Sequence, residues 1–225
     1  RRVRVTNRSR HRRTIEVTTY AEVVLAPPSN DWQHPAFSNL FVQTEILPKR
    51  QAILCNRRPR SEHEQNPWMF HLLAVHGAFH TDVSYETDRM KCIGRGNTLV
   101  NPTALKATKE LSGSQGSVLD PIVAIRCRIT LDPEESATIN MVTGVADNRD
   151  GCLALVEKYQ DRRLADRVFD LAWTHSQVVL RQINADEADG QLYARLASYV
   201  LYANSALRAD ASVLMKNRRG QQGLW

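Results

Sequence analysis

Hydrophobic and polar residues alternate one by one along the segment 13–28, RTIEVTTYAEVVLAPP. This period of two is typical of a β-strand with one buried face, and the segment is rich in β-branched residues. Two prolines end the run, because proline cannot donate a hydrogen bond to a neighbouring strand. At about 3.3 Å per residue the predicted strand is about 40 Å long, so it needs long partners on both sides. We therefore expect it to be a central strand of a large antiparallel sheet.

Shorter segments with the same alternation, or with an apolar run between turn formers, predict further strands as far as residue 146. These segments are 1–7, 40–48, 52–59, 68–76, 80–88, 117–131 and 136–146. In the second-last of them, Ile125 and Cys127 alternate with Arg126 and Arg128, which predicts one buried face and one polar face. Pro121 in the same segment predicts a bulge or an edge position.

Two segments of this β-rich part lack a periodic pattern. The segment 29–39 is rich in proline and turn formers, so we expect a loop. In the segment 88–116, Gly, Asn, Pro, Ser and Lys dominate, which predicts a long loop with one short helix near 103–109. Loops of that length are uncommon inside compact domains and often carry function.

After residue 147 the apolar residues recur every three or four positions, which predicts helices. Two of them cover 148–159 and 161–183. A third predicted helix carries an apolar stripe of Leu192, Leu196, Val200 and Ala203. Asn184 and Ala185 interrupt the pattern, and Asp186 is the expected N-cap of the third helix. A run of strands followed by a run of helices indicates a β domain joined to a helical one.

The composition is that of a folded, soluble domain. Of the 225 residues, 42% are hydrophobic and 24% are charged, which is enough to bury a core. No apolar run approaches the ~20 residues of a membrane helix. The four cysteines have no C-x-x-C spacing, so we expect reduced thiols in a cytosolic setting: Cys55, Cys92, Cys127 and Cys152. The chain begins inside a strand-like stretch and stops after Gly-Leu-Trp, so we expect a segment of a longer protein.

The net charge of +6 is concentrated at the start of the chain, where the first thirteen residues hold seven arginines. One interpretation is an arm that binds a polyanion. The other is a solvated β-hairpin with its turn at 7–10. The alternation of Val3 and Val5 before the turn, and of Ile15 and Val17 after it, favours the hairpin, because a disordered arm would not show it.

The chain shows no catalytic constellation of its own. His71, His76 and His80 lie close in sequence, but the first two face opposite sides of an extended strand and no fourth ligand is suitably spaced, so we expect no metal site. The run 94–96, Gly-Arg-Gly, is too short for a phosphate-binding loop. The strand carboxylates are expected to be solvated: Glu16, Glu22 and Glu45. We therefore assign no catalytic residue.

Several stretches, in order and at matching spacing over essentially the whole chain, resemble the cyclic β-1,2-glucan synthases. They are RTIEVTTYAEVVLAPP, HPAFSNLFVQTEILP, ILCNRRPRS, ETDRMKCIGRGNTL, LSGSQGSVLDPIVAIRCRITL, FDLAWTHSQVVLR, LYARLASYVLY and NRRGQQGLW. The similar part of those enzymes is C-terminal and belongs with the cellobiose and chitobiose phosphorylases in glycoside hydrolase family 94. The resemblance implies an antiparallel β-supersandwich of the galactose-mutarotase-like kind, then linker helices leading to an (α/α)6 barrel. On this basis we place the supersandwich at 1–146, the helical linker at 147–209 and the start of the catalytic barrel at 210–225.

The resemblance also implies a chemistry, inverting phosphorolysis. In this reaction a carboxylic acid protonates the glycosidic oxygen while inorganic phosphate attacks the anomeric carbon from the opposite face. The family's general-acid aspartate lies downstream in the barrel. We therefore expect this segment to be inactive alone, with inorganic phosphate as a co-substrate of the intact enzyme and no other cofactor.

Two sets of carbohydrate-binding positions follow from the resemblance. The tail matches a motif that continues into the loop forming the sugar subsite next to the cleaved bond, and its positions are Arg218, Arg219, Gln221 and Trp225. The loop with Asp88 and Arg95 matches one that, in the phosphorylases, reaches the active site of the neighbouring subunit, which implies a homodimer. A structural role is the alternative for the tail, with its arginines at a helix C-terminus and Trp225 in the core.

The first functional hypothesis is a carbohydrate-binding and scaffolding segment of a glucan-processing enzyme. Its implied partners are β-glucan oligosaccharides and the remaining domains of the parent chain, on the cytoplasmic face of the bacterial inner membrane. The rival is a nucleic-acid-binding β module that uses the basic cluster from Arg1 to Arg13, although we expect no nucleic-acid partner. A third option is a segment that binds nothing and only supports the barrel. Salt separates the first two, because binding to a phosphate backbone weakens steeply with salt and sugar binding does not.

Overall fold

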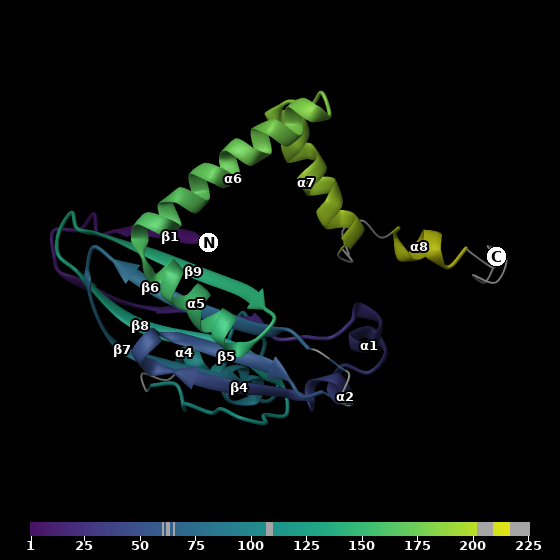
Figure 1. The fold of residues 1–225 in the computed structure, drawn as a ribbon, viewed down its shortest axis with the longest axis horizontal. Coiled ribbons are helices and arrows are strands. Elements are labelled where there is room, and N and C mark those ends of the chain that lie inside the picture. Colours follow the sequence, from purple (N-terminus) through teal and green to yellow (C-terminus); the bar gives the residue numbers. More distant parts are fainter. Residues whose placement is uncertain (60, 62–63, 65, 107–109, 202–208, 217–225) are drawn as a thin grey trace. The chain divides into compact units, whose positions relative to one another are not determined.

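The computed structural model describes residues 1–59, 61, 64, 66–106, 110–201 and 209–216. The chain divides into two compact units, Arg1–Arg167 and Val168–Trp225. The first unit is built mainly from β-strands and the second from helices (Figure 1). Antiparallel sheets followed by helices agree with the fold class that the sequence predicts. The (α/α)6 barrel implied by the resemblance is absent from the described residues and stays a prediction.

Five antiparallel strands form the first sheet, in the order β1-β9-β6-β5-β4. Their bounds are β1 Arg2–Thr6, β4 Val42–Leu47, β5 Ala52–Arg57, β6 Trp68–His76 and β9 Ser136–Ala146. His71 in the middle of β6 lies opposite Ile53 on one side and Thr143 on the other. The structure confirms each of these strands, and β6 is buried along most of its length.

The second sheet is organised around β8 (Pro121–Leu131). It pairs with β2 (Arg13–Thr18) and β3 (Ala21–Glu22) along one edge and with β7 (Phe79–Asp88) along the other. Pro121 begins the strand next to a register shift, so the predicted bulge is confirmed, whereas the alternative of an edge strand is wrong because β8 is central.

The prediction that 13–28 forms one long central strand is wrong. The segment makes two strands separated at Thr19 and Tyr20, and β8 is its one strand partner within the described ranges. At the break, the hydroxyl of Thr19 accepts the backbone N–H of Ile125 at 3.0 Å. The Thr19 hydroxyl therefore replaces the backbone carbonyl that a paired strand would offer to Ile125. The strand pairing is interrupted, but the buried N–H of Ile125 keeps a hydrogen-bond acceptor.

The hairpin predicted around 7–10 is also wrong, although both of its strands exist. β1 pairs with β9 in the first sheet and β2 with β8 in the second, so the connection crosses from one sheet to the other. Asn7, 7% exposed, holds this crossing: its side-chain amide donates to the carbonyls of His11 (2.8 Å), Leu131 (3.0 Å) and Asp132 (3.1 Å). Because the link from β8 to β9 crosses at the same end, Asn7 joins the two crossings.

The inner faces of the two sheets pack together and form the main core. The alternation predicted for β8 is confirmed on the core side, since Ile125 and Cys127 are fully buried in this core. On the opposite face Arg126 is also buried, with 3% of its surface exposed. Other members come from both sheets: Val42, Ile53, Cys55, Leu73, Val75, Val123, Ile129, Leu131, Ala137 and Ile139. Burial of this much apolar surface is the main term that stabilises the first unit.

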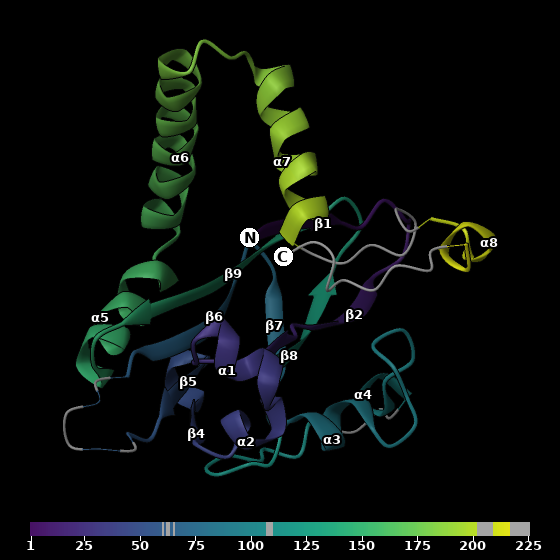
Figure 2. The same cartoon turned by 90° about the vertical axis from the view of Figure 1, so that its right-hand side faces the viewer.

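Helices cover the outer faces of both sheets (Figure 2). α5 (Arg149–Gln160) packs Cys152 and Val156 against Phe70 of the first sheet, as the period of three and four predicts. Asn148 caps α5 by accepting the N–H of Gly151 at 2.8 Å. On the far side, α3 (Arg89–Ile93) and α4 (Thr103–Lys106) lie over the second sheet.

Short helices also occur where loops were predicted. The segment 29–39 contains most of α1 (Pro28–Gln33) and all of α2 (Pro35–Asn39), so the prediction of an irregular loop is wrong there. Both helices begin with a proline, whose missing N–H is not needed in the first turn. The predicted helix near 103–109 corresponds to α4, and α3 was not predicted.

The second unit holds most of α6 (Arg162–Gln182), α7 (Glu187–Leu201) and α8 (Ala211–Leu214). The predicted cap of α7 is confirmed: Asp186 accepts the N–H of Asp189 at 2.8 Å, and Asp189 accepts that of Asp186 at 3.1 Å. None of the helices among the described residues combines the length and hydropathy that a transmembrane span requires.

Candidate functional site

The connection between β7 and β8 is anchored at its start by two carboxylates. Asp88 caps α3, because its carboxylate accepts the N–H of Met90 at 2.9 Å. Glu86, 1% exposed, accepts the N–H groups of Thr87 and Asp88 at 3.0 Å each, and also the hydroxyl of Ser112. Since Ser112 lies near the other end of the connection, this buried carboxylate ties both ends together.

The middle of the connection is exposed and shaped by a glycine. Gly94 ends α3 at φ +88°, and a Cβ atom at this position would overlap the hydroxyl of Thr103 in α4. Arg95 follows on the surface. Leu99 and Val100, further along, are 56% and 94% exposed. The connection therefore carries a cation and large apolar side chains on its surface.

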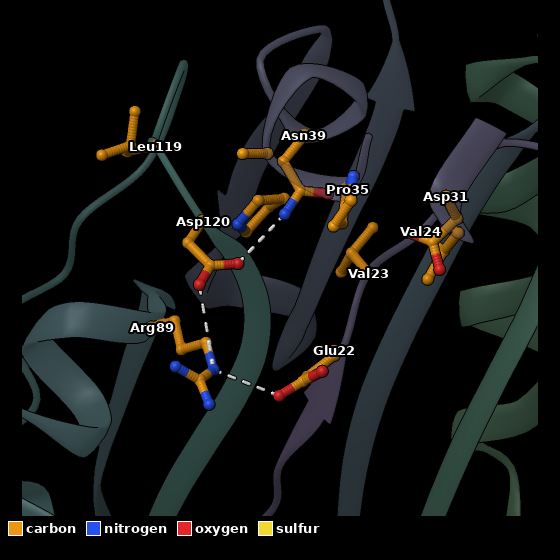
Figure 3. A pocket seen from close by; sticks show the side chains of 11 residues that line it. Glu22, Val23, Val24, Asp31, Pro35, Asn39, Arg89, Leu119 and Asp120 are labelled. Carbon is orange, nitrogen blue, oxygen red and sulfur yellow. Dashed lines mark hydrogen bonds and ion pairs between the residues drawn. The ribbon is translucent and has the colours of Figure 1, made fainter. Parts of the chain in front are cut away.

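A pocket of about 480 Å³ opens beside α3 (Figure 3). Its volume lies within the range of about 300–1,000 Å³ that small-molecule sites occupy. It is lined by Glu22, Val23, Val24, Asp31, Pro35, Ala36, Asn39, Arg89, Leu119, Asp120 and Pro121. The short helices α1 and α2, the end of β3 and the start of β8 therefore build one concave surface next to the predicted loop.

A hydrogen-bonded group of polar side chains forms one side of this pocket. Arg89 Nε donates to Glu22 Oε1 at 3.1 Å and lies 3.8 Å from Asp120 Oδ2. Asn39 donates to Asp120 Oδ1 at 3.1 Å, and the Tyr20 hydroxyl donates to Glu22 Oε1 at 3.0 Å. Two carboxylates thus fix the orientation of the guanidinium.

The pocket environment shifts the pKa of Asp120 and that of Tyr20. Partial burial raises the pKa of Asp120, and the nearby Arg89 guanidinium opposes this increase. Burial and the hydrogen bond to Glu22 raise the pKa of Tyr20, so this phenol stays protonated and remains a donor at neutral pH.

The structure describes two of the six predicted carbohydrate-binding residues. Asp88 and Arg95 belong to the same connection, but the carboxylate of Asp88 serves as a helix cap. Arg218, Arg219, Gln221 and Trp225 lie outside the described residues, so their assignment stays a prediction. Sequence reasoning missed Asn39 and Asp120, whereas Arg89 lies within the loop 88–95 that the resemblance marks.

The other candidates from the sequence were a histidine metal site and the N-terminal basic cluster. Within the described ranges, no group of three or more His, Cys, Asp or Glu side chains could hold a metal ion. His71 is buried between Thr19 (2.9 Å) and Thr143 (2.8 Å), and desolvation lowers its pKa to about 4. The basic cluster is spread over β1, β2 and the link between them, with Arg2 ion-paired to Asp166 at 2.7 Å.

Two stacked antiparallel sheets with helices on their outer faces define a sandwich domain, and comparison with known families identifies its kind. The family model described as "Glycosyl hydrolase 94, supersandwich domain" matches residues 1–162, so the chain belongs to this family. Over 225 residues it is 32% identical to "Cyclic beta-(1,2)-glucan synthase NdvB" of Rhizobium meliloti (strain 1021). The match covers 100% of this chain and 8% of that protein's length, so the chain corresponds to a segment of a larger, NdvB-like protein. The resemblance stated from the sequence is thereby confirmed.

Proposed function

We propose that this chain is a carbohydrate-binding and scaffolding segment in a glycoside-phosphorylase-like part of a cyclic β-1,2-glucan synthase. The observation that carries the proposal is the family membership of residues 1–162, together with similarity along the whole chain to a relative named as such a synthase. The intact part would cleave linear β-glucan by inverting phosphorolysis and so control chain length before cyclisation.

The separate roles of this segment and of the parent's helical domain follow from the chemistry of the reaction. Inverting phosphorolysis needs a general acid at the glycosidic oxygen and a phosphate bound on the opposite face of the sugar. We assign the general acid to the parent's helical domain, with inorganic phosphate as its co-substrate. The segment then holds glucan through the connection between β7 and β8, where Arg95 is exposed, and supports the catalytic domain through its helices.

Titration calorimetry of the chain with linear β-1,2-linked glucose oligomers tests the binding claim. We expect measurable heat at millimolar sugar, and a weaker affinity for Arg95→Ala. Arg8→Ala removes an exposed arginine from the sheet crossing at the other end of β8 and should leave the affinity unchanged. A flat thermogram for the unmodified chain would refute sugar binding.

Titration calorimetry with an oligonucleotide, at low and at moderate salt, tests the rival function. A nucleic-acid module that uses Arg1 to Arg13 would bind an oligonucleotide with an affinity that falls steeply between low and moderate salt. Glucan is uncharged, so its binding should change little over the same range. Salt-sensitive oligonucleotide binding without glucan binding would favour the rival.

The proposal extends to the assembly and location of the parent protein. We place this segment on the cytoplasmic face of the bacterial inner membrane, in a homodimer. Protease digestion of a tag inserted in this segment should therefore occur in inverted membrane vesicles and not in intact spheroplasts. Crosslinking of the intact protein between two copies tests the dimer.

A further inference from the structure

We propose that the pocket formed by Glu22, Asn39, Arg89 and Asp120 binds one neutral sugar residue of a glucan chain. The inference rests on the proposed function and assigns a second contact for the glucan, at the start of the same connection between β7 and β8. Three properties of the pocket support the inference. Arg89 has hydrogen-bond donors that no residue of the pocket uses, the carboxylates have unused acceptor sites, and the lining is net negative with apolar walls.

Arg89 retains hydrogen-bond donors for a ligand. Both contacts to the carboxylates of Glu22 and Asp120 use Nε, as Figure 3 shows. A guanidinium has five N–H donors in a rigid plane, more than these contacts and the nearby Tyr20 hydroxyl consume. The Arg89 side chain is 41% exposed, so the remaining donors are accessible from the pocket.

The carboxylates retain acceptor capacity. Both hydrogen bonds made by Glu22 go to Oε1, and the one from Asn39 goes to Asp120 Oδ1. An ionised carboxylate has about four acceptor sites. Donors and acceptors are therefore fixed side by side, which suits a hydroxyl group, because a hydroxyl both donates and accepts.

The charge of the pocket decides between ligand classes. Three carboxylates, Glu22, Asp31 and Asp120, line it together with one guanidinium, so it is net negative and repels phosphate or another anion. Val24 and Leu119, which are 39% and 75% exposed, add apolar surface to the lining for the C–H face of a ring. A neutral polyhydroxylated ring satisfies both requirements.

Two variants test the pocket in the full chain. Arg89→Lys keeps the positive charge between Glu22 and Asp120 but removes the planar fork, so we expect about tenfold weaker binding of linear β-1,2-linked glucose oligomers. Ala36→Phe places a ring on the exposed wall of the pocket and should abolish the same binding. Because Ala36 is exposed on a helix, this variant leaves the core intact.

Arg128→Lys is the matched control. Arg128 is also 41% exposed and also lies between two carboxylates, Glu16 at 2.8 Å and Asp82 at 3.0 Å, but it does not line the pocket. Its replacement should leave glucan affinity unchanged. A circular dichroism spectrum of each variant checks that the fold is kept.

The outcomes separate this inference from the proposed function. If Arg95→Ala weakens glucan binding while Arg89→Lys and Ala36→Phe leave it intact, the pocket is not a sugar site. The proposed function of the segment would then still stand. Absence of glucan binding to the unmodified chain would overturn both. A third outcome is that the chain binds a polyamine but no glucan, and that Ala36→Phe abolishes the polyamine binding. The pocket would then be a cation site, and the inference would be overturned.

Discussion

His71 makes the stability of the first unit depend on pH. It is 4% exposed, and its two ring nitrogens lie 2.8 Å from the Thr143 hydroxyl and 2.9 Å from that of Thr19. These contacts link the first sheet to the break between β2 and β3 in the second. Burial disfavours the charged imidazolium and lowers the pKa of His71 to about 4, below the usual value of about 6.5.

The sign of the effect follows from proton binding in the two states. The unfolded chain takes up a proton at His71 as the pH falls through about 6.5, whereas the folded protein does so only near pH 4. Stability is therefore complete above the unfolded pKa and is lost as the pH falls towards the folded pKa. Linkage gives a loss of about 2 kcal/mol between pH 7 and pH 5, and of about 3 kcal/mol below pH 4.

The measurement compares urea unfolding at pH 7 and pH 5 for the unmodified chain and for His71→Gln. Glutamine keeps one donor and one acceptor but does not titrate, so its pH-dependent loss should be smaller by about 2 kcal/mol. His34→Gln, which removes an exposed imidazole, is the control and should behave like the unmodified chain. An equal pH-dependent loss in His71→Gln, or an NMR titration of His71 with a midpoint near 6.5, would refute the reasoning.

Two further substitutions test packing on the outer face of the first sheet and the crossing that joins the two sheets. At Gly144 a Cβ atom would lie 2.6 Å from Cε1 of the buried Phe70 ring, so Gly144→Ala should cost about 1–3 kcal/mol in urea unfolding. Val145→Ala, at the next and 62% exposed position, should cost less, and equal losses would contradict the packing argument. Asn7→Ala leaves several carbonyls of the sheet crossings without their donor and should cost about 1–3 kcal/mol. Arg8→Ala beside it should be nearly neutral; if both lose the same stability, Asn7 does not hold the crossing.

The pocket shows why the candidate site could be predicted only in part. Asp88 and Arg95 were assigned because the resemblance points to their loop, and their role in binding stays a prediction. Arg89, Asn39 and Asp120 come from α3, α2 and the residue before β8, and no periodic pattern connects them. Their proximity depends on these two short helices, which lie in two segments whose composition indicates loops. Each of these helices is shorter than a stable isolated helix, so tertiary contacts rather than local preference decide that they form.

By itself the sequence determined which segments are strands and where the long helices begin, because these features depend on the periodicity of side chains within one segment. β6, β8 and α5 were predicted for this reason, and the family was evident from the order and spacing of its motifs. Only the tertiary structure decided which strand pairs with which. Strands β1 and β2 alternate as a hairpin would, yet each pairs in a different sheet, because Asn7 stabilises a crossing through carbonyls more than a hundred residues away. Such contacts leave no local periodicity, so the hairpin, the central strand and the pocket could not be settled from the sequence.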